Sequence, residues 1–205
     1  MTATLGSLAE VTVGLTLRTP EAARPALDGN FHLLRISDID DFGRVTPDLD
    51  IRIRVDDPKA IARHRLLPGD VVLANRGTKA KAGLITQDLP IVAAGQFYII
   101  RIKDTRLQPA YLVWFLNHPE TQRTLFEGSG VSIVRSILAP QVRNTQILLP
   151  SLATQARIVE LFALRAQEQN LVRQIDSLKA QLVDRLLFKA ASHTTSHPLA
   201  APHVL

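Results

Sequence analysis

The feature that most constrains this chain is an uninterrupted amphipathic stretch in its last third. Neither glycine nor proline occurs between Ser151 and Phe188, and Pro150 stands directly before the stretch. Proline breaks a helix interior whereas serine is a good N-cap, so the sequence predicts a helix that begins at Ser151. A helix of about 38 residues would be about 57 Å long at about 1.5 Å per residue. One preceding domain cannot bury that length, so we expect the helix to need a partner and to act as a spacer.

Apolar side chains recur along this helix in steps of three and four residues, the spacing of a heptad seam. The same seam has charged positions at Glu168 and Arg185. The pattern predicts a helical pair or coiled coil over residues 148–189. We predict that six seam residues contact the partner helix: Leu161, Leu164, Leu171, Ile175, Leu178 and Leu182.

Composition limits the classes of function. The 205 residues allow one domain of about 150 residues plus the helix. The chain has no cysteine, which excludes disulfides, thiolate zinc sites and thiol nucleophiles and suits a cytoplasmic protein. The sequence shows no signal-peptide pattern and no apolar run long enough to span a bilayer. We therefore expect a cytoplasmic protein without a membrane partner.

The charge of the chain permits a nucleic-acid partner without requiring one. The net charge is +5 and the basic residues are mostly arginine, which pairs well with phosphates and with guanine edges. Because the excess is small, a DNA-binding surface would have to be local. Residues 190–205 are rich in Ala, Ser, Thr, Pro and His without periodicity, and we expect them to form a disordered tail.

Residues 1–147 carry the pattern of one small α+β domain. Apolar, β-branched segments bounded by Pro, Gly and Asp predict strands at 32–36, 51–55, 70–74 and 97–102. Segments that open with proline predict helices at 109–117 and 119–127. The expected fold class is therefore a small mixed sheet with helices, followed by the long C-terminal helix.

Two loops of this domain combine cations or hydroxyl groups with small residues. The first follows the strand at 70–74 and holds Arg76, Thr78, Lys79 and Lys81. The second, Gly128–Arg135, holds Ser129, Ser132 and Arg135. Small residues let the backbone approach a phosphate, and clustered cations make a local anion site. An ordinary solvated loop explains either segment equally well when it is taken alone.

One constellation suggests an enzyme. Asp48, Asp57 and Lys59 imitate the metal-binding carboxylates and the lysine of a common magnesium-dependent nuclease family. That family places its second carboxylate and its lysine on one strand, whereas Pro58 separates them here, and proline is poor inside a sheet. A solvated loop is the favoured interpretation, and the nuclease remains an alternative.

Taken in order, five segments resemble the DNA-specificity subunit of type I restriction–modification systems, in a form with a single recognition domain. The resemblance covers residues 5–188. Its last segment is the motif Leu148-Leu149-Pro150-Ser151-Leu152-x-x-Gln155-x-x-Ile158 at the start of the long helix. The earlier segments are Leu33–Ile39, Leu67–Gly77, the Tyr111-Leu112-x-x-Phe115-Leu116 motif and Gly128–Gly130. A full family member has two recognition domains and two long helices, so this chain resembles half a subunit.

The resemblance implies a function without catalysis, cofactor or metal. Residues 1–147 would be a target-recognition domain for duplex DNA, and residues 148–189 a spacer and dimerisation helix. The partners implied are an adenine-specific (N6) DNA methyltransferase subunit and, in systems that restrict phage DNA, a restriction subunit. A second copy, paired antiparallel through the long helix, would give a bipartite target.

On this interpretation, DNA contact falls to the two loops. The predicted DNA-binding residues are Arg76, Thr78, Lys79, Lys81, Ser129, Ser132 and Arg135, with Arg35 as an additional candidate. A protein whose helix joins only protein partners, without DNA, is the remaining alternative. Salt-dependent DNA binding would argue against it, because phosphate contacts release counterions.

Overall fold

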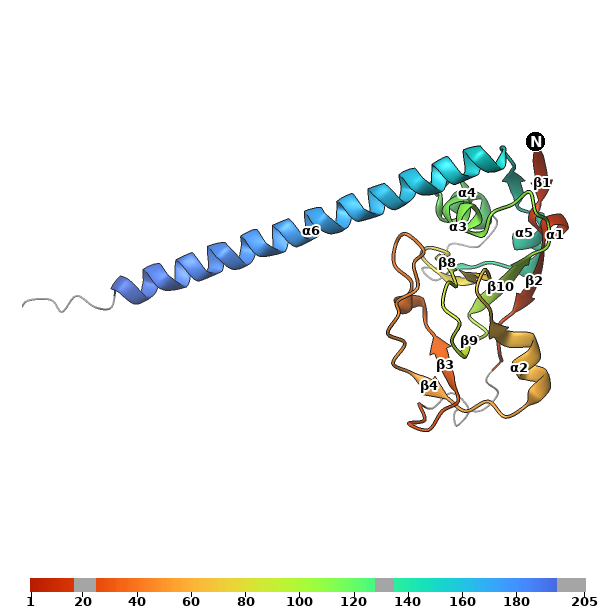
Figure 1. Cartoon of the computed structure of the whole chain (residues 1–205), viewed down its shortest axis with the longest axis horizontal. Helices are drawn as coiled ribbons and strands as arrows, with labels where there is room; N and C mark the ends of the chain where they lie inside the picture. Colours follow the sequence, from red (N-terminus) through yellow and green to blue (C-terminus); the bar gives the residue numbers. More distant parts are fainter. Residues whose placement is uncertain (17–24, 128–134, 195–205) are drawn as a thin grey trace, which may run out of the picture. The chain divides into compact units, whose positions relative to one another are not determined.

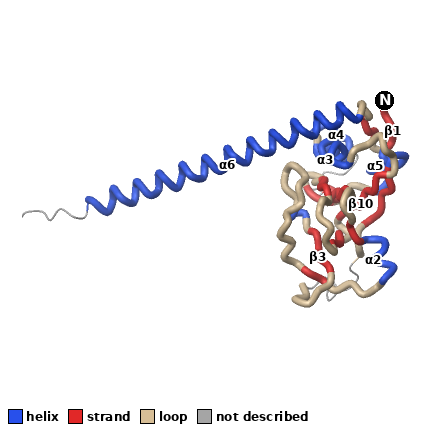
Figure 2. Tube along the Cα trace, in the orientation of Figure 1, coloured by secondary structure: helices blue, strands red, loops and turns tan. Residues whose placement is uncertain are grey.

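The computed structural model describes residues 1–16, 25–127 and 135–194. The chain divides into two compact units, Met1–Phe162 and Ala163–Leu205. The first unit is built of short strands and helices, and the described part of the second is a single helix (Figures 1 and 2). The predicted α+β fold with a long C-terminal helix is confirmed.

The strands of the first unit are short, and the buried members are rich in Val, Ile, Leu and Phe. In chain order they are β1 (Thr2–Thr4), β2 (Ala9–Val13), β3 (Phe31–Leu34), β4 (Arg52–Ile53), β5 (Arg65–Leu66), β6 (Val71–Ala74), β7 (Arg76–Gly77), β8 (Ala82–Leu84), β9 (Ile91–Ala93), β10 (Phe97–Ile102), β11 (Arg135–Ser136) and β12 (Gln146–Leu148).

Three of the described helices, α2, α3 and α4, begin with a proline. Proline suits this position because the backbone N–H of the first helical residue has no acceptor within the helix. In chain order the described helices are α1 (Leu5–Leu8), the 3-10 turn η1 (Ile36–Asp38), α2 (Pro58–His64), α3 (Pro109–Asn117), α4 (Pro119–Leu125), α5 (Ala139–Asn144) and α6 (Leu152–Thr194).

The described residues of the first unit form two four-stranded sheets and two two-stranded ladders. The first sheet is antiparallel and has the order β2-β10-β6-β8, whereas the second has the order β4-β3-β9-β5 with β3 and β9 parallel. β1 pairs with β12, and β7 pairs with β11. Helix α3 packs on β6 and β8, where its Leu112 and Leu116 are fully buried in the main core (Figure 1).

The predicted strands and helices of the first unit are found within a few residues of their expected ends. Around β4, Ile53 and Val55 are buried while Arg52 and Arg54 are exposed, as expected where one face of an extended segment lies on the core and the other faces solvent. The expectation of a solvated loop around Pro58 was wrong. Residues Pro58–His64 form α2, because the Asp57 carboxylate accepts a hydrogen bond from the Lys59 amide and caps this helix.

Helix α6 begins where the sequence predicted. The Ser151 hydroxyl accepts a hydrogen bond from the Thr154 amide at 3.2 Å, as an N-cap does. The helix has 43 residues and extends past Phe188 to Thr194. The tail was expected from residue 190, so residues 190–194 correct that expectation, since alanine at 190 and 191 favours continuation of the helix. Residues 195–205 lie outside the described part.

The first turn of α6 is fixed to the rest of the first unit by Gln155. Its side chain is fully buried, accepts a hydrogen bond from the Gln108 amide and donates to the carbonyls of Arg106 and Pro150. All the polar groups of this buried carboxamide are therefore satisfied. The sequence singled out Gln155 only through the resemblance, and the structure gives it a physical role.

Candidate nucleic-acid interface

The structure places Arg135, the described end of the second predicted loop, beside the first predicted loop. The two-residue ladder of β7 and β11 places Gly77 opposite Arg135 and Arg76 opposite Ser136. Gly77, the last residue of β7, has a φ of +137°, which residues with a side chain rarely adopt. Glycine therefore allows the chain to turn at the end of β7. Next to the ladder, the Asn75 carbonyl accepts a hydrogen bond from the Ile137 amide at 2.9 Å. Arg135 and the first loop therefore share one surface.

Two side-chain amides hold the first loop in an extended conformation. Asn117, at the end of α3, accepts from the Ala82 amide and donates to the Ala82 carbonyl, both at 2.9 Å. Gln122, in α4, accepts from the Ala80 amide at 2.9 Å and donates to the Ala80 carbonyl at 3.0 Å. Each amide thus imitates a neighbouring strand. The loop backbone is fixed without a further strand beside it.

These hydrogen bonds from Asn117 and Gln122 determine which side chains the loop exposes. Ala80 and Ala82 are fully buried, whereas Lys79 is exposed and Lys81 is half-buried. Side chains alternate between the two faces of an extended segment, so the alanines face the protein and the lysines face away from it. The two predicted cations are therefore presented by the packing of the two alanines.

A pocket of about 290 Å³ lies between this loop and α4. It is lined by Thr78, Lys79, Lys81 and Arg135 from the predicted set. Arg123 of α4 adds a fourth cation, and Asp41 is the one carboxylate among the described lining residues. The uncharged lining residues are Asn117, Pro119, Gln122 and Phe126. Four cations against one carboxylate give the pocket a positive potential suited to a phosphate.

The cations of the pocket differ in how firmly they are held. Lys81 donates to the Ile39 carbonyl at 3.1 Å and lies 3.5 Å from the Asp41 carboxylate. The Arg135 guanidinium lies 4.4 Å from the centre of the Phe126 ring, a cation–π distance. Arg123 forms an exposed ion pair with Glu120, which a stronger anion can replace. Arg135 is thus oriented in advance, and none of the described carboxylates forms an ion pair with it.

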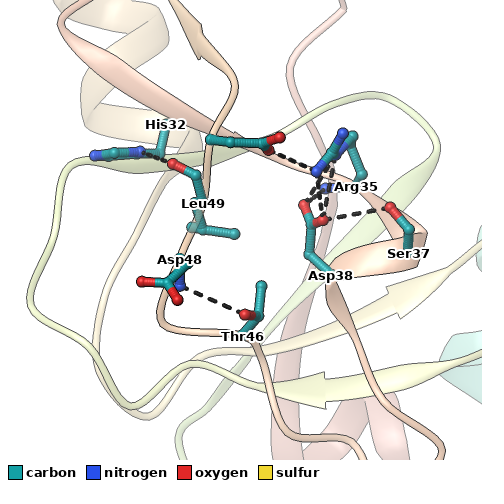
Figure 3. A network of polar contacts seen from close by, with 8 residues as sticks. His32, Arg35, Ser37, Asp38, Thr46, Asp48 and Leu49 are labelled. Carbon is teal, nitrogen blue, oxygen red and sulfur yellow. Dashed lines mark hydrogen bonds and ion pairs between the residues drawn. The ribbon is translucent and has the colours of Figure 1, made fainter.

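The remaining predicted residues lie elsewhere. Arg76 is exposed and lines a separate hollow of about 550 Å³ with Thr16, Gly95 and Gln96 among others. The Arg35 guanidinium binds the carboxylates of Asp38 at 2.9 Å and Asp50 at 2.6 Å (Figure 3). These partners, Asp38 first, raise the pKa of Arg35, and they neutralise its charge. Ser129 and Ser132 lie outside the described residues.

Sequence reasoning missed three residues of this site. Arg123, at i,i+3 from Glu120, has the pattern of an ordinary solvated helix face. Asn117 and Gln122 act through contacts 35 and 42 residues away, so no local pattern reveals them. Only the tertiary fold brings these side chains to the loop.

The structure gives the two carboxylates of the nuclease constellation different surroundings. The Asp57 carboxylate caps α2, while Asp48 lies in another loop, where its amide donates to the Thr46 hydroxyl (Figure 3). Among residues 1–16, 25–127 and 135–194, no group of three His, Cys, Asp or Glu side chains is placed to hold a metal ion.

The six seam residues of α6 are between 50% and 67% exposed. Val172, Val183, Leu186, Leu187 and Phe188 are exposed as well. An exposed apolar row of this length on a helix normally contacts a partner. The described helices include none that is both long and apolar enough to cross a membrane.

Removing the Asn117 side-chain amide tests whether its two hydrogen bonds to Ala82 stabilise the loop. Asn117→Ala leaves the amide and the carbonyl of the buried Ala82 without partners, so we expect the free energy of unfolding to fall by about 1–3 kcal/mol. Chemical denaturation of the purified chain measures this change. The control is Asn144→Ala, which removes an exposed amide at the end of α5 and should change stability by less than about 0.5 kcal/mol. Equal stability of the two variants would contradict the role of Asn117.

Comparisons with known proteins point to one fold. No protein-family model matches the chain, and no curated protein matches its sequence. A structure of a type I restriction–modification system, described for its complex assembly and conformational transition, matches with a TM-score of 0.66 and 19% identity. That match covers 91% of this chain and 43% of the other.

Two crystal structures of specificity subunits are similar as well. The HsdS subunit from Thermoanaerobacter tengcongensis matches with a TM-score of 0.56 and 19% identity, over 85% of this chain and 39% of that chain. The type I S subunit from M. genitalium matches with a TM-score of 0.55 and 11% identity, over 90% of this chain and 44% of that chain. The chain spans less than half the length of each match, and it shares their fold.

Proposed function

We propose that this chain recognises duplex DNA sequence-specifically for a partner adenine-specific DNA methyltransferase and is not itself catalytic. The observation that carries the proposal is the pocket in which Thr78, Lys79, Lys81 and Arg135 meet Arg123. Four of the eight predicted DNA contacts, three from the first loop and Arg135 from the second, thus line one positively charged pocket. The fold shared with type I specificity subunits supports the same function.

The chemistry of the surface suggests how the work is divided. Lysine is a flexible point charge that neutralises phosphates, so Lys79 and Lys81 suit the DNA backbone. Arginine can bind a guanine edge with two parallel hydrogen bonds, which suits the pre-oriented Arg135 and the exposed Arg76. Thr78 contributes a hydroxyl that can donate to either. Phosphate contacts position the domain, and the arginines read bases.

The exposed seam of α6 suits self-pairing. A second copy that covers it would bring a second recognition domain, and the two domains would bind two half-sites at a fixed separation. The methyltransferase supplies the chemistry, and a restriction subunit joins in systems that restrict foreign DNA. The site of action is then the cytoplasm.

Selection from a random duplex library tests this function. The full chain, purified with its methyltransferase partner, is incubated with the library, and bound duplexes are sequenced. We expect two short conserved half-sites separated by a gap of constant length, with affinity that falls linearly on a log–log plot against salt. Recovery of no common sequence would overturn sequence-specific recognition. Absence of any salt-dependent DNA binding would favour the protein-adaptor alternative, and magnesium-dependent cleavage of the library would favour the nuclease.

A further inference from the structure

We infer that two copies of α6 pair antiparallel in one register, in which Glu168 of each copy faces Arg185 of the other. This inference rests on the self-pairing in the proposed function and adds to it the alignment of the two helices. Seam positions continue at alternating steps of three and four from Leu161 to Lys189 and Ser192.

Two charges interrupt the apolar part of the seam. Between Leu164 and Arg185, Glu168 and Arg185 are the charged seam residues, and both are exposed. Within the part of the chain that the structure describes, no ion pair joins either of them to another side chain. A charge in the seam of a coiled coil weakens pairing unless the partner helix supplies the opposite charge. Between Leu164 and Arg185 the seam therefore carries one acid and one base, each lacking a counterpart within the described chain.

A two-fold axis between Asp176 and Ser177 supplies both counterparts at once. This point is equally far from Glu168 and Arg185, so an antiparallel second copy places its Arg185 opposite Glu168 and its Glu168 opposite Arg185. The same axis places Leu171 opposite Leu182 and Ile175 opposite Leu178. One alignment thus pairs both charges and matches every apolar layer between them.

Other alignments leave the charges unpaired. Sliding the second helix by one heptad in either direction places Glu168 opposite Leu178 or Arg185 opposite Ile175, so a charge is buried among apolar side chains. A parallel pair places Glu168 opposite Glu168 and Arg185 opposite Arg185, which repel each other. Charge complementarity thus selects both the direction and the register of the pair.

The residues along one flank of the seam favour no register, so the register depends on Glu168 and Arg185. Glutamine stands at 167, 174 and 181, one heptad apart and beside the seam. Uncharged flanking residues neither attract nor repel a second copy in any register, whereas charged flanks often determine pairing.

The register also determines how far apart the two α6 helices begin. The first residue of α6 lies about 37 Å from the axis at about 1.5 Å per residue, so the two helix starts are about 74 Å apart along the pair.

Reversal of the charges tests the register. Glu168→Arg and Arg185→Glu each create two like-charge contacts per dimer, so each should weaken self-association by at least about tenfold. The double variant restores opposite charges and should self-associate within about threefold of the original chain. Sedimentation equilibrium of the full-length variants measures the dissociation constants. A double variant as weak as the single ones would overturn the pairing of Glu168 with Arg185.

Cysteine cross-linking provides a second measurement, since the chain has no cysteine of its own. Mixed Leu171→Cys and Leu182→Cys chains should form a disulfide on oxidation, because the two positions face each other. Leu171→Cys with Ile175→Cys, and Leu178→Cys with Leu182→Cys, report the two slid registers and should not cross-link. Leu171→Cys alone reports a parallel pair. A dimer that cross-links only in a control overturns the register, whereas a chain that stays monomeric overturns the self-pairing in the proposed function.

Discussion

Replacing Lys79 and Arg135 with glutamate should weaken binding of the complex to its selected duplex by at least about a hundredfold. Each replacement removes a charge-assisted contact of about 1.5–3 kcal/mol and places a carboxylate where a phosphate would lie. Lys79 is exposed and Arg135 lies over the Phe126 ring at the surface of the pocket, so the fold should tolerate both changes. Fluorescence anisotropy with the selected duplex measures the affinity.

The salt dependence of binding separates local contact from a general effect of charge. If both residues contact phosphates, the slope of log affinity against log salt should fall in magnitude by about 2, whereas a base-reading Arg135 would lower it by about 1. The matched control is Lys103→Glu with Arg54→Glu, two exposed cations outside the pocket that give the same change in net charge. If this control weakened binding as much as the pocket variant, the pocket would not be the DNA site.

The fold could be predicted where local chemistry determines it. Proline at 58, 109 and 119 begins a helix in each case, and the last two helices were predicted from their first-turn prolines. After Pro109, apolar residues at helical spacing supported the prediction as well. Around Pro58 the sequence also fitted a metal-binding carboxylate at Asp57, whereas in the structure this carboxylate caps the helix.

The candidate site could be predicted only in part. Clustered cations indicated Lys79 and Lys81, but their outward orientation depends on burial of Ala80 and Ala82 against α3 and α4. The pairing of β7 with β11 joins segments about 60 residues apart and involves only two residues from each, too few for a strand pattern. Arg35 differs from these cations, since its guanidinium is paired with the carboxylates of Asp38 and Asp50. Charge in a sequence does not show which carboxylates will neutralise it.

Replacing Leu171 and Leu178 with aspartate should abolish self-association at micromolar concentrations. In the proposed antiparallel pair these residues face Leu182 and Ile175, so each dimer would bury four carboxylates among apolar side chains. Burying an unpaired charge costs several kcal/mol, more than the pairing of two short apolar seams can offset. Light scattering on the eluting protein should then give the mass of one chain.

The control for this variant keeps its charge and its helix. Ser177→Asp with Ala180→Asp also adds two carboxylates to α6, at exposed positions off the seam, and should leave the two-chain mass unchanged. Circular dichroism should show equal helix content in both variants, so that loss of pairing is not mistaken for loss of the helix. Because the recognition domain is left intact, the Leu171 and Leu178 variant should still bind a single half-site, but with little preference for duplexes that hold two half-sites at the selected spacing. Retention of that preference by a monomeric variant would show that something other than α6 sets the distance between the two recognition domains.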